Sequence, residues 1–161
     1  MPIRQQGVIL IEALIGILIF SMGILALVAM QSAAISSQTD AQYRIEAANF
    51  ANKMLGEIWL NVDRTTAGTL QASLNAFAHQ PVGGNCNFTG AVSTDPGALV
   101  AAWVNELTTG AGTSLPGATQ TMQQILVDTT AGSYNSVQVT VCWKSPNDTV
   151  ARRHSVISKI N

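Results

Sequence analysis

Charged residues are scarce in this chain of 161 residues. Asp, Glu, Lys and Arg together make up 11% of the sequence, against about 25% in a typical soluble domain. Glu12 is the only charged residue between Arg4 and Asp40. This scarcity excludes a disordered polyelectrolyte and argues against a highly charged cytosolic enzyme. The net charge of −1 offers no overall attraction to nucleic acid, and we expect no nucleic-acid partner.

Cysteine and histidine are equally rare, with two residues of each. Two cysteines exclude a disulfide-dense scaffold and a zinc site built on cysteine alone. His79 and His154 stand in unrelated sequence contexts, and the chain has no CxxC, HExxH or glycine-rich phosphate-binding motif. The sequence therefore predicts a protein that is not an enzyme and that needs no cofactor or metal.

A long apolar run is the strongest positive feature. Val8 to Met30 covers 23 residues, in which Glu12 carries the only charge and Ser21 is the only other polar side chain. About 20 apolar residues of helix cross the hydrocarbon core of a bilayer. A core helix of a soluble protein is usually amphipathic, and a cleaved signal peptide has a shorter apolar region. We therefore predict a membrane span over 8–30, with Arg4 on the cytoplasmic side.

Glu12 is the unusual residue of this run. An ionised carboxylate inside lipid costs several kcal/mol and needs a partner, yet no basic residue lies one helical turn away. If the chain is cut after Gly7, the new α-ammonium of Val8 could pair with Glu12 of the same chain or of a neighbour. Alternatively, Glu12 sits hydrated at the headgroup boundary, helped by the helix N-terminus. The sequence leaves both readings open.

The segment Gly7-Val8-Ile9-Leu10-Ile11-Glu12 resembles the cleavage motif of type IV prepilins. That motif has a glycine, an aromatic residue, a small hydroxyl residue, two aliphatic residues and a glutamate. Val8 stands where phenylalanine is usual, and Ile9 stands where serine or threonine is usual. The resemblance implies a leader peptide over 1–7, cleavage between Gly7 and Val8 by prepilin peptidase, N-methylation of Val8, and Glu12 as an assembly contact.

The first 62 residues resemble the minor pilins of the PilV type, which are related to the I-position minor pseudopilins of type II secretion. The resemblance rests on Leu14-Ile15, the run Gly23-Ile24-Leu25-Ala26-Leu27, Met30-Gln31, Ala47, Ala48, Ala51, Met54 and Asn61. Major pilins usually have a proline in the middle of the membrane helix, near the place of Ala29. They also usually close a short C-terminal loop with a disulfide, a pattern that this sequence lacks. Both departures favour a minor subunit.

The resemblance implies a fold, a place and a role. The fold is α+β, with a long N-terminal helix packed on a small C-terminal antiparallel sheet. The chain lies in the bacterial inner membrane with a periplasmic head, and later in the pilus at the cell surface. It contributes to priming pilus assembly with other minor pilins and the major pilin. Two alternatives stay open: a minor pseudopilin of type II secretion, and an adhesin or receptor module displayed by the pilus.

The residues beyond the span predict a second half of the same helix over 31–62. This stretch has no proline, and Phe50, Met54, Ile58 and Val62 recur every four residues. Such spacing places them on one helix face. We expect this stripe to pack on the protein's own head, residues 63–161, and the continuous helix to cover 8–62.

Within the head, periodic patterns predict two short helices and a sheet. One helix covers 69–79; another starts at Asp95-Pro96, with Asp95 as its N-cap, and ends at Gly110. Gly83-Gly84-Asn85 and Ser145-Pro146-Asn147-Asp148 are turn signals. Alternation of apolar and polar residues over 137–144 predicts a strand. We expect partner strands over 150–160 and 124–129, in an antiparallel sheet packed on the long helix.

Two further features of the head carry predictions. Cys86 and Cys142 are 56 positions apart, and in an extracytoplasmic head we expect them to form a disulfide. Two buried free thiols are the alternative. Arg152 and Arg153 would point to opposite sides of a strand, so we interpret them as part of a solvated edge rather than a DNA or anion site.

Overall fold

The structure is a computed structural model, and it describes residues 6–95, 97–110, 115–146 and 148–161. Residues 1–5 of the predicted leader, Pro96, residues 111–114 and Asn147 therefore lie outside the described residues. The chain divides into two compact units, residues 1–42 and 43–161. Each is described below by itself.

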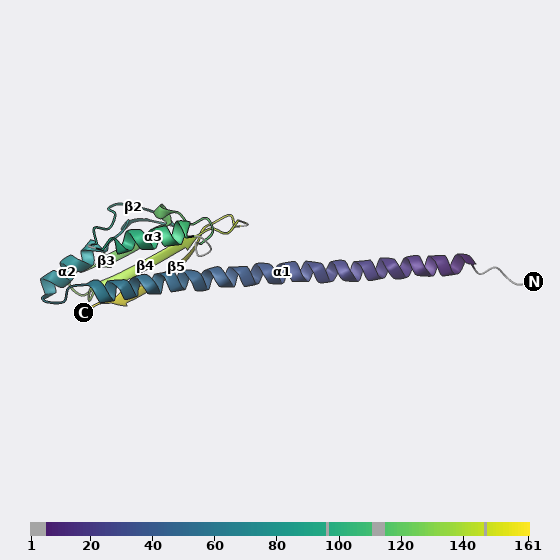
Figure 1. Ribbon diagram of the computed structural model, residues 1–161, viewed down its shortest axis with the longest axis horizontal. Helices are drawn as coiled ribbons and strands as arrows, with labels where there is room; N and C mark the ends of the chain where they lie inside the picture. Colours follow the sequence, from purple (N-terminus) through teal and green to yellow (C-terminus); the bar gives the residue numbers. More distant parts are fainter. Residues whose placement is uncertain (1–5, 96, 111–114, 147) are drawn as a thin grey trace, which may run out of the picture. The chain divides into compact units, whose positions relative to one another are not determined.

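Helix α1 covers Gln6–Asn61, 56 residues (Figure 1). The predicted helix over 8–62 is confirmed to within two residues at each end. Its length follows from the sequence, because the interior contains no proline to remove a backbone hydrogen bond. In the first unit the side chains from Val8 onward are almost all exposed.

The last part of α1 belongs to the second unit and buries one face. Phe50, Met54, Ile58 and Val62 are all buried, together with Ala47, Ala51 and Leu55 that lie beside them. These residues share one hydrophobic core with side chains from the two short helices and the sheet. The predicted packing of this stripe on the protein's own head is confirmed.

Helix α2 covers Ala67–Ala76, whereas the sequence predicted 69–79. It starts earlier because Thr66 and Thr69 form a capping box at its N-terminus. The Thr66 side chain accepts a hydrogen bond from the Thr69 N–H, and Thr69 Oγ1 accepts one from the Thr66 N–H. It ends earlier because His79 pairs instead with Ile125 through two backbone hydrogen bonds, of 2.9 and 3.0 Å. The apolar face that suggested the helix, Leu70, Leu74 and Phe77, is buried as expected.

Helix α3 covers Leu99–Thr109 and is closed by Gly110, as predicted for its end but not for its start. The N-cap is Ala98, in the left-handed region at φ 49°, so the prediction of Asp95 as the N-cap is wrong; Pro96, the predicted first residue, lies outside the described residues. Asp95 nevertheless serves the helix N-terminus, because its Oδ2 accepts hydrogen bonds from the backbone N–H groups of Leu99 and Val100. The carboxylate thus reaches the first turn from a position before the cap.

Three antiparallel strands form the sheet, in the order β3–β4–β5 (Figure 1). They are β3 (Gln123–Asp128), β4 (Ser136–Trp143) and β5 (Arg152–Lys159), close to the predicted ranges. In the register, Val139 lies between Ile125 and Val156, and all three pack in the core. The predicted α+β, pilin-like layout is therefore confirmed: a long N-terminal apolar helix packed on a small antiparallel sheet.

The sequence did not predict the small hairpin of β1 (Val82–Gly84) and β2 (Asn87–Thr89). The expected turn at Gly83–Asn85 is shifted, because the two loop residues are Asn85 and Cys86, with φ of 51° and 61°. Two left-handed residues are typical of a type I′ hairpin turn. Only glycine fits at position 83, because a Cβ atom there would lie 2.3 Å from the Asn87 carbonyl oxygen.

Candidate functional site

The predicted cleavage point lies at the start of α1. The Gly7–Val8 peptide bond falls in the first helical turn, since α1 begins at Gln6. An 18-residue window of the helix has a mean hydropathy of 2.7, and none of it is buried. The helix is thus long and apolar enough to span a membrane.

Glu12 lies one helical turn after Val8, and the two share a face of α1. With Ile11 and Ile15 they border a shallow hollow of about 350 Å³ on the helix surface. Within the described residues, no group donates a hydrogen bond to the Glu12 carboxylate. Chemically, this is a single carboxylate among aliphatic side chains, and any partner for its charge must come from outside the side chains of its own helix.

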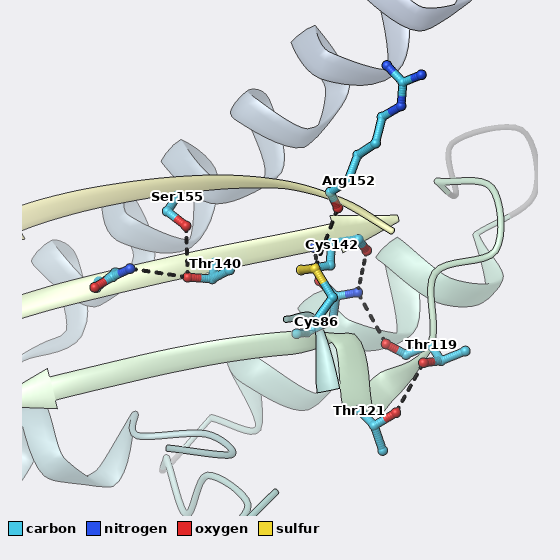
Figure 2. The surroundings of a disulfide bond; sticks show 9 residues. Cys86, Thr119, Thr121, Thr140, Cys142, Arg152 and Ser155 are labelled. Atoms are coloured by element: carbon cyan, nitrogen blue, oxygen red, sulfur yellow. Dashed lines mark hydrogen bonds between the residues drawn. A yellow bond between two sulfur atoms is a disulfide. The ribbon is translucent and has the colours of Figure 1, made fainter. Parts of the chain in front are cut away.

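Cys86 and Cys142 are joined by a disulfide, so the predicted pairing is confirmed (Figure 2). Cys86 lies in the hairpin turn between β1 and β2, and Cys142 lies on β4. Cys142 points away from the main core, because its neighbours Val141 and Trp143 point into that core. With the buried Phe88 the two cysteines form a second small apolar cluster, which holds the hairpin against the sheet.

Gln123 on β3 supports the disulfide from the neighbouring strand. Its amide Nε2 donates to the Cys142 carbonyl oxygen at 3.0 Å, and its Oε1 accepts from the Cys142 N–H at 3.2 Å. Gln123 is fully buried, and both ends of its amide are thereby satisfied, as a buried polar group requires. The sequence did not single this residue out, because an isolated glutamine carries no spacing signal.

Arg152 and Arg153, near the start of β5, lie in different surroundings. Arg152 donates from Nε and Nη2 to the two carboxylate oxygens of Asp148, at 2.7 and 2.9 Å. These hydrogen bonds hold the pKa of Asp148 below its usual range. Arg153 points to the opposite side of the strand and is exposed. This arrangement fits a solvated edge better than a concentrated anion site.

A pocket that the sequence did not predict lies beside α3, with a volume of about 450 Å³. Its wall includes His79, Val92, Asn105 and Gln120, which stand far apart in the sequence. His79 is 3% exposed. Its Nδ1 accepts a hydrogen bond from the Ser93 N–H at 3.4 Å, which assigns the ring proton to Nε2. That Nε2–H is buried and has no partner within the described residues.

Burial lowers the pKa of His79 below its usual value. The nearby Asp95 carboxylate acts to raise this pKa, but its effect is smaller than that of burial. The imidazole is therefore held in its neutral form at neutral pH. Asp95 is engaged at both oxygens, because Oδ1 accepts from the Ser93 hydroxyl at 2.6 Å while Oδ2 serves the N-terminus of α3. Ser93 thus links the imidazole to the carboxylate. A lone histidine in sequence gave no sign of this burial.

Comparison of the chain with family models, with curated proteins and with solved structures finds no match. Within the described residues, no group of three or more His, Cys, Asp and Glu side chains could hold a metal ion. The absence of enzymatic activity stays a prediction of the sequence. The structure shows a long apolar helix that could span a membrane, followed by an α+β head with a disulfide.

Proposed function

We propose that this protein is a minor pilin of a type IV pilus, of the PilV type, and that it helps to prime pilus assembly together with other minor pilins and the major pilin. The observation that carries the proposal is Glu12. It is a lone carboxylate on an exposed apolar helix, one turn beyond the residue that would become the N-terminus after cleavage at Gly7.

Two further observations support the proposal. The apolar side chains of the first half of α1 are exposed, and we propose that lipid covers them first and neighbouring helices afterwards. The head has a disulfide, which suits an oxidising compartment outside the cytoplasm. In this proposal the leader is cytoplasmic, the head is periplasmic, and the mature chain leaves the inner membrane for the pilus.

Prepilin peptidase would remove residues 1–7 and expose the α-amine of Val8, which N-methylation would leave protonatable. An α-amine has a reference pKa of about 7.7–8.0 and is mostly protonated at neutral pH. Axial stagger between subunits could bring this ammonium of one chain beside Glu12 of another. Removing one member of a buried ion pair costs about 3–5 kcal/mol, enough to decide whether a subunit docks.

The test replaces Glu12 in cells whose only copy carries the change. Glu12→Gln keeps the shape and removes the charge, whereas Glu12→Lys reverses it. We expect both to insert and to be cleaved, since Gly7 and the apolar helix remain. Both should reduce surface piliation, with lysine worse because it meets the ammonium with like charge.

Ser21→Ala is the matched control in the same membrane segment. The Ser21 hydroxyl donates a hydrogen bond to the Ile17 carbonyl oxygen of its own helix, at 2.7 Å, so we expect piliation to stay normal. Membrane levels are matched by immunoblot. Normal piliation with Glu12→Lys would show that this carboxylate is not the assembly contact. Loss of type II secretion with intact piliation would assign the protein to the secretion pseudopilins instead.

A further inference from the structure

Strand β5 forms one edge of the sheet, because β4 is its only neighbour among the described strands. Successive residues of an antiparallel strand direct their backbone N–H and C=O groups alternately toward and away from a given partner. The Ile160 N–H donates to the Asn135 carbonyl oxygen at 3.1 Å, and these two residues continue the β4–β5 register by one pair. The even-numbered residues of β5 therefore bond β4. The odd-numbered residues direct their N–H and C=O groups to the free edge, and they are Arg153, Ser155, Ile157 and Lys159.

A pair of hydrogen bonds at the opposite edge of the sheet agrees with this assignment. Ile125 on β3 exchanges both backbone hydrogen bonds with His79, so its partner Val139 turns its N–H and C=O groups toward β5. Val139 lies opposite Val156, an even-numbered residue. His79 thus covers part of the β3 edge. On the β5 edge, no described backbone group outside β4 bonds the odd-numbered residues.

The side chains of these four odd-numbered residues are uncovered as well. All four are exposed, and Ile157 is 64% exposed. Ser155 shares a hydrogen bond of 3.0 Å with Thr140 on the same face of the sheet (Figure 2). Ile157 lies opposite Gln138, which in turn lies opposite Leu126 on β3, and Leu126 is 38% exposed. An edge strand with free backbone groups and an exposed aliphatic side chain is a template for one more strand.

Charge decides which strand this edge can accept. Arg153 and Lys159 stand at its two ends, and Lys159 Nζ lies 4.6 Å from the centre of the Tyr134 ring. Proteins often protect sheet edges with such charges, but here the two odd-numbered residues between them carry none. If two copies of β5 paired antiparallel about Val156, Arg153 of each chain would lie opposite Lys159 of the other. Like charges directly opposite each other destabilise a strand pair, so the edge disfavours a second copy of this chain.

We propose that the free edge of β5 binds an extended acidic segment of a different protein by strand addition. The segment places carboxylates opposite Arg153 and Lys159 and an aliphatic side chain opposite Ile157. Backbone hydrogen bonds to the odd-numbered residues supply affinity, and the side chains on the shared face supply selectivity. Tyr134, which is 63% exposed, adds aromatic surface beside Lys159 of the kind that is enriched at protein interfaces. This binding involves the head alone and does not depend on the pilin function.

The test uses the full chain in detergent micelles, labelled with ¹⁵N, and two heptapeptides with blocked ends. The acidic probe is Glu-Thr-Val-Val-Thr-Thr-Glu, and the basic probe has lysine in place of both glutamates. In the free protein, the N–H groups of Ser155 and Ile157 should exchange with deuterium faster than those of Val156 and Ser158, which bond β4. A saturating concentration of the acidic probe should slow the exchange of Ser155 and Ile157 by about tenfold. We expect a dissociation constant of about 0.1–1 mM for so short a peptide, and no slowing with the basic probe.

Two variants tie the binding to this edge. Ile157→Pro removes an N–H that points away from β4, a position at which an edge strand tolerates proline, and should abolish binding. Arg153→Glu combined with Lys159→Glu should weaken binding of the acidic probe about tenfold and favour the basic probe instead. Arg64→Glu combined with Lys144→Glu is the matched control, because it changes the net charge equally at exposed residues outside β5, and it should bind like the parent. Thermal midpoints show whether each variant is folded, and the charge reversal decides the matter if the proline variant is not.

Protection of Ser155 and Ile157 by the acidic probe in the parent, and by the basic probe only after charge reversal, supports the proposal. The proposal is overturned if neither probe slows these amides, if the basic probe acts on the parent as well as the acidic one, or if the control variant loses binding. It is also overturned if the amides are protected without a probe and the protection rises with protein concentration, because a second copy then occupies the edge. None of these readouts involves a pilus, so a failure here leaves the role of Glu12 to its own test.

Discussion

The indole Nε1–H of Trp103 on α3 donates a hydrogen bond to the backbone carbonyl oxygen of Phe50 on α1, at 3.0 Å. Trp103 is 3% exposed, and the bond joins residues 53 positions apart. On the exposed rim of the same contact, Lys53 pairs with Glu106 at 2.5 Å. The buried bond is the more valuable of the two, because exposed ion pairs contribute about 0–1 kcal/mol.

Trp103→Phe should therefore destabilise the head. The change removes a buried hydrogen bond and part of a large core side chain, and we expect a loss of about 1–3 kcal/mol in the free energy of unfolding. Trp59→Phe is the matched control, because Trp59 is 41% exposed and should cost less than about 1 kcal/mol. Denaturant unfolding of the full chain in detergent, followed by circular dichroism, measures both. Equal losses would refute the role given to the Trp103 bond.

The disulfide should be complete and stabilising. Labelling of the unreduced, denatured protein should detect no free thiol, because Cys86 and Cys142 are bonded to each other. For a separation of 56 residues, the chain-entropy relation gives about 4 kcal/mol of stabilisation. Replacing both cysteines by alanine should remove that amount in the same unfolding experiment. Two labelled thiols per chain would contradict the pairing and weaken the case for an extracytoplasmic head.

Processing should begin the mature chain at Val8. Removal of the first seven of the 161 residues leaves 154, and intact-mass analysis should show this loss, with or without one added methyl group. Cells that lack prepilin peptidase should retain the full mass. A mature chain that starts near Ser32 would identify an ordinary signal peptide and would end the pilin proposal.

Stability should depend on pH through His79. Burial lowers its pKa in the folded protein below the usual value of about 6.5, so between the two values the unfolded chain binds more protons. The free energy of unfolding should therefore fall as the pH drops through about 6.5, and this fall should end below the folded pKa. Denaturant unfolding between pH 8 and pH 5 measures it.

His79→Gln should remove this dependence, whereas the matched variant His154→Gln should keep it. The lowered pKa values of Asp63, Asp128 and Asp148 act in a different window. Their contribution is present above the usual aspartate pKa of about 4 and is lost only at lower pH. A slope between pH 7 and pH 5 that survives in His79→Gln would show that another group is responsible.

Periodic stretches were predictable because their signal is local. The stripe of Phe50, Met54 and Ile58 follows from helical spacing alone, and the alternation along β4 follows from the pleat of a strand. The boundaries that were missed depend on particular side chains. Thr66 starts α2 earlier than its apolar face suggests, and Ala98 starts α3 later than Pro96 suggested, while Asp95 still reaches the helix N-terminus.

The candidate sites also differ in whether their residues are close together in the sequence. Gly7, Val8 and Glu12 are close in sequence, so a short motif could mark them, and the structure adds only that they share the first turns of an exposed helix. The pocket beside α3 joins His79, Asn105 and Gln120, which no sequence motif connects.

The sequence by itself determined the long apolar helix, the stripe that anchors the head and the strands of the sheet, because each is a repeating pattern within one segment. Only the tertiary structure decided that His79 is buried and neutral beside Ser93, that Gln123 supports the disulfide, and that the hairpin turns at Cys86. Those outcomes depend on which distant segments pack together, and packing is set by the whole core rather than by any one stretch of chain.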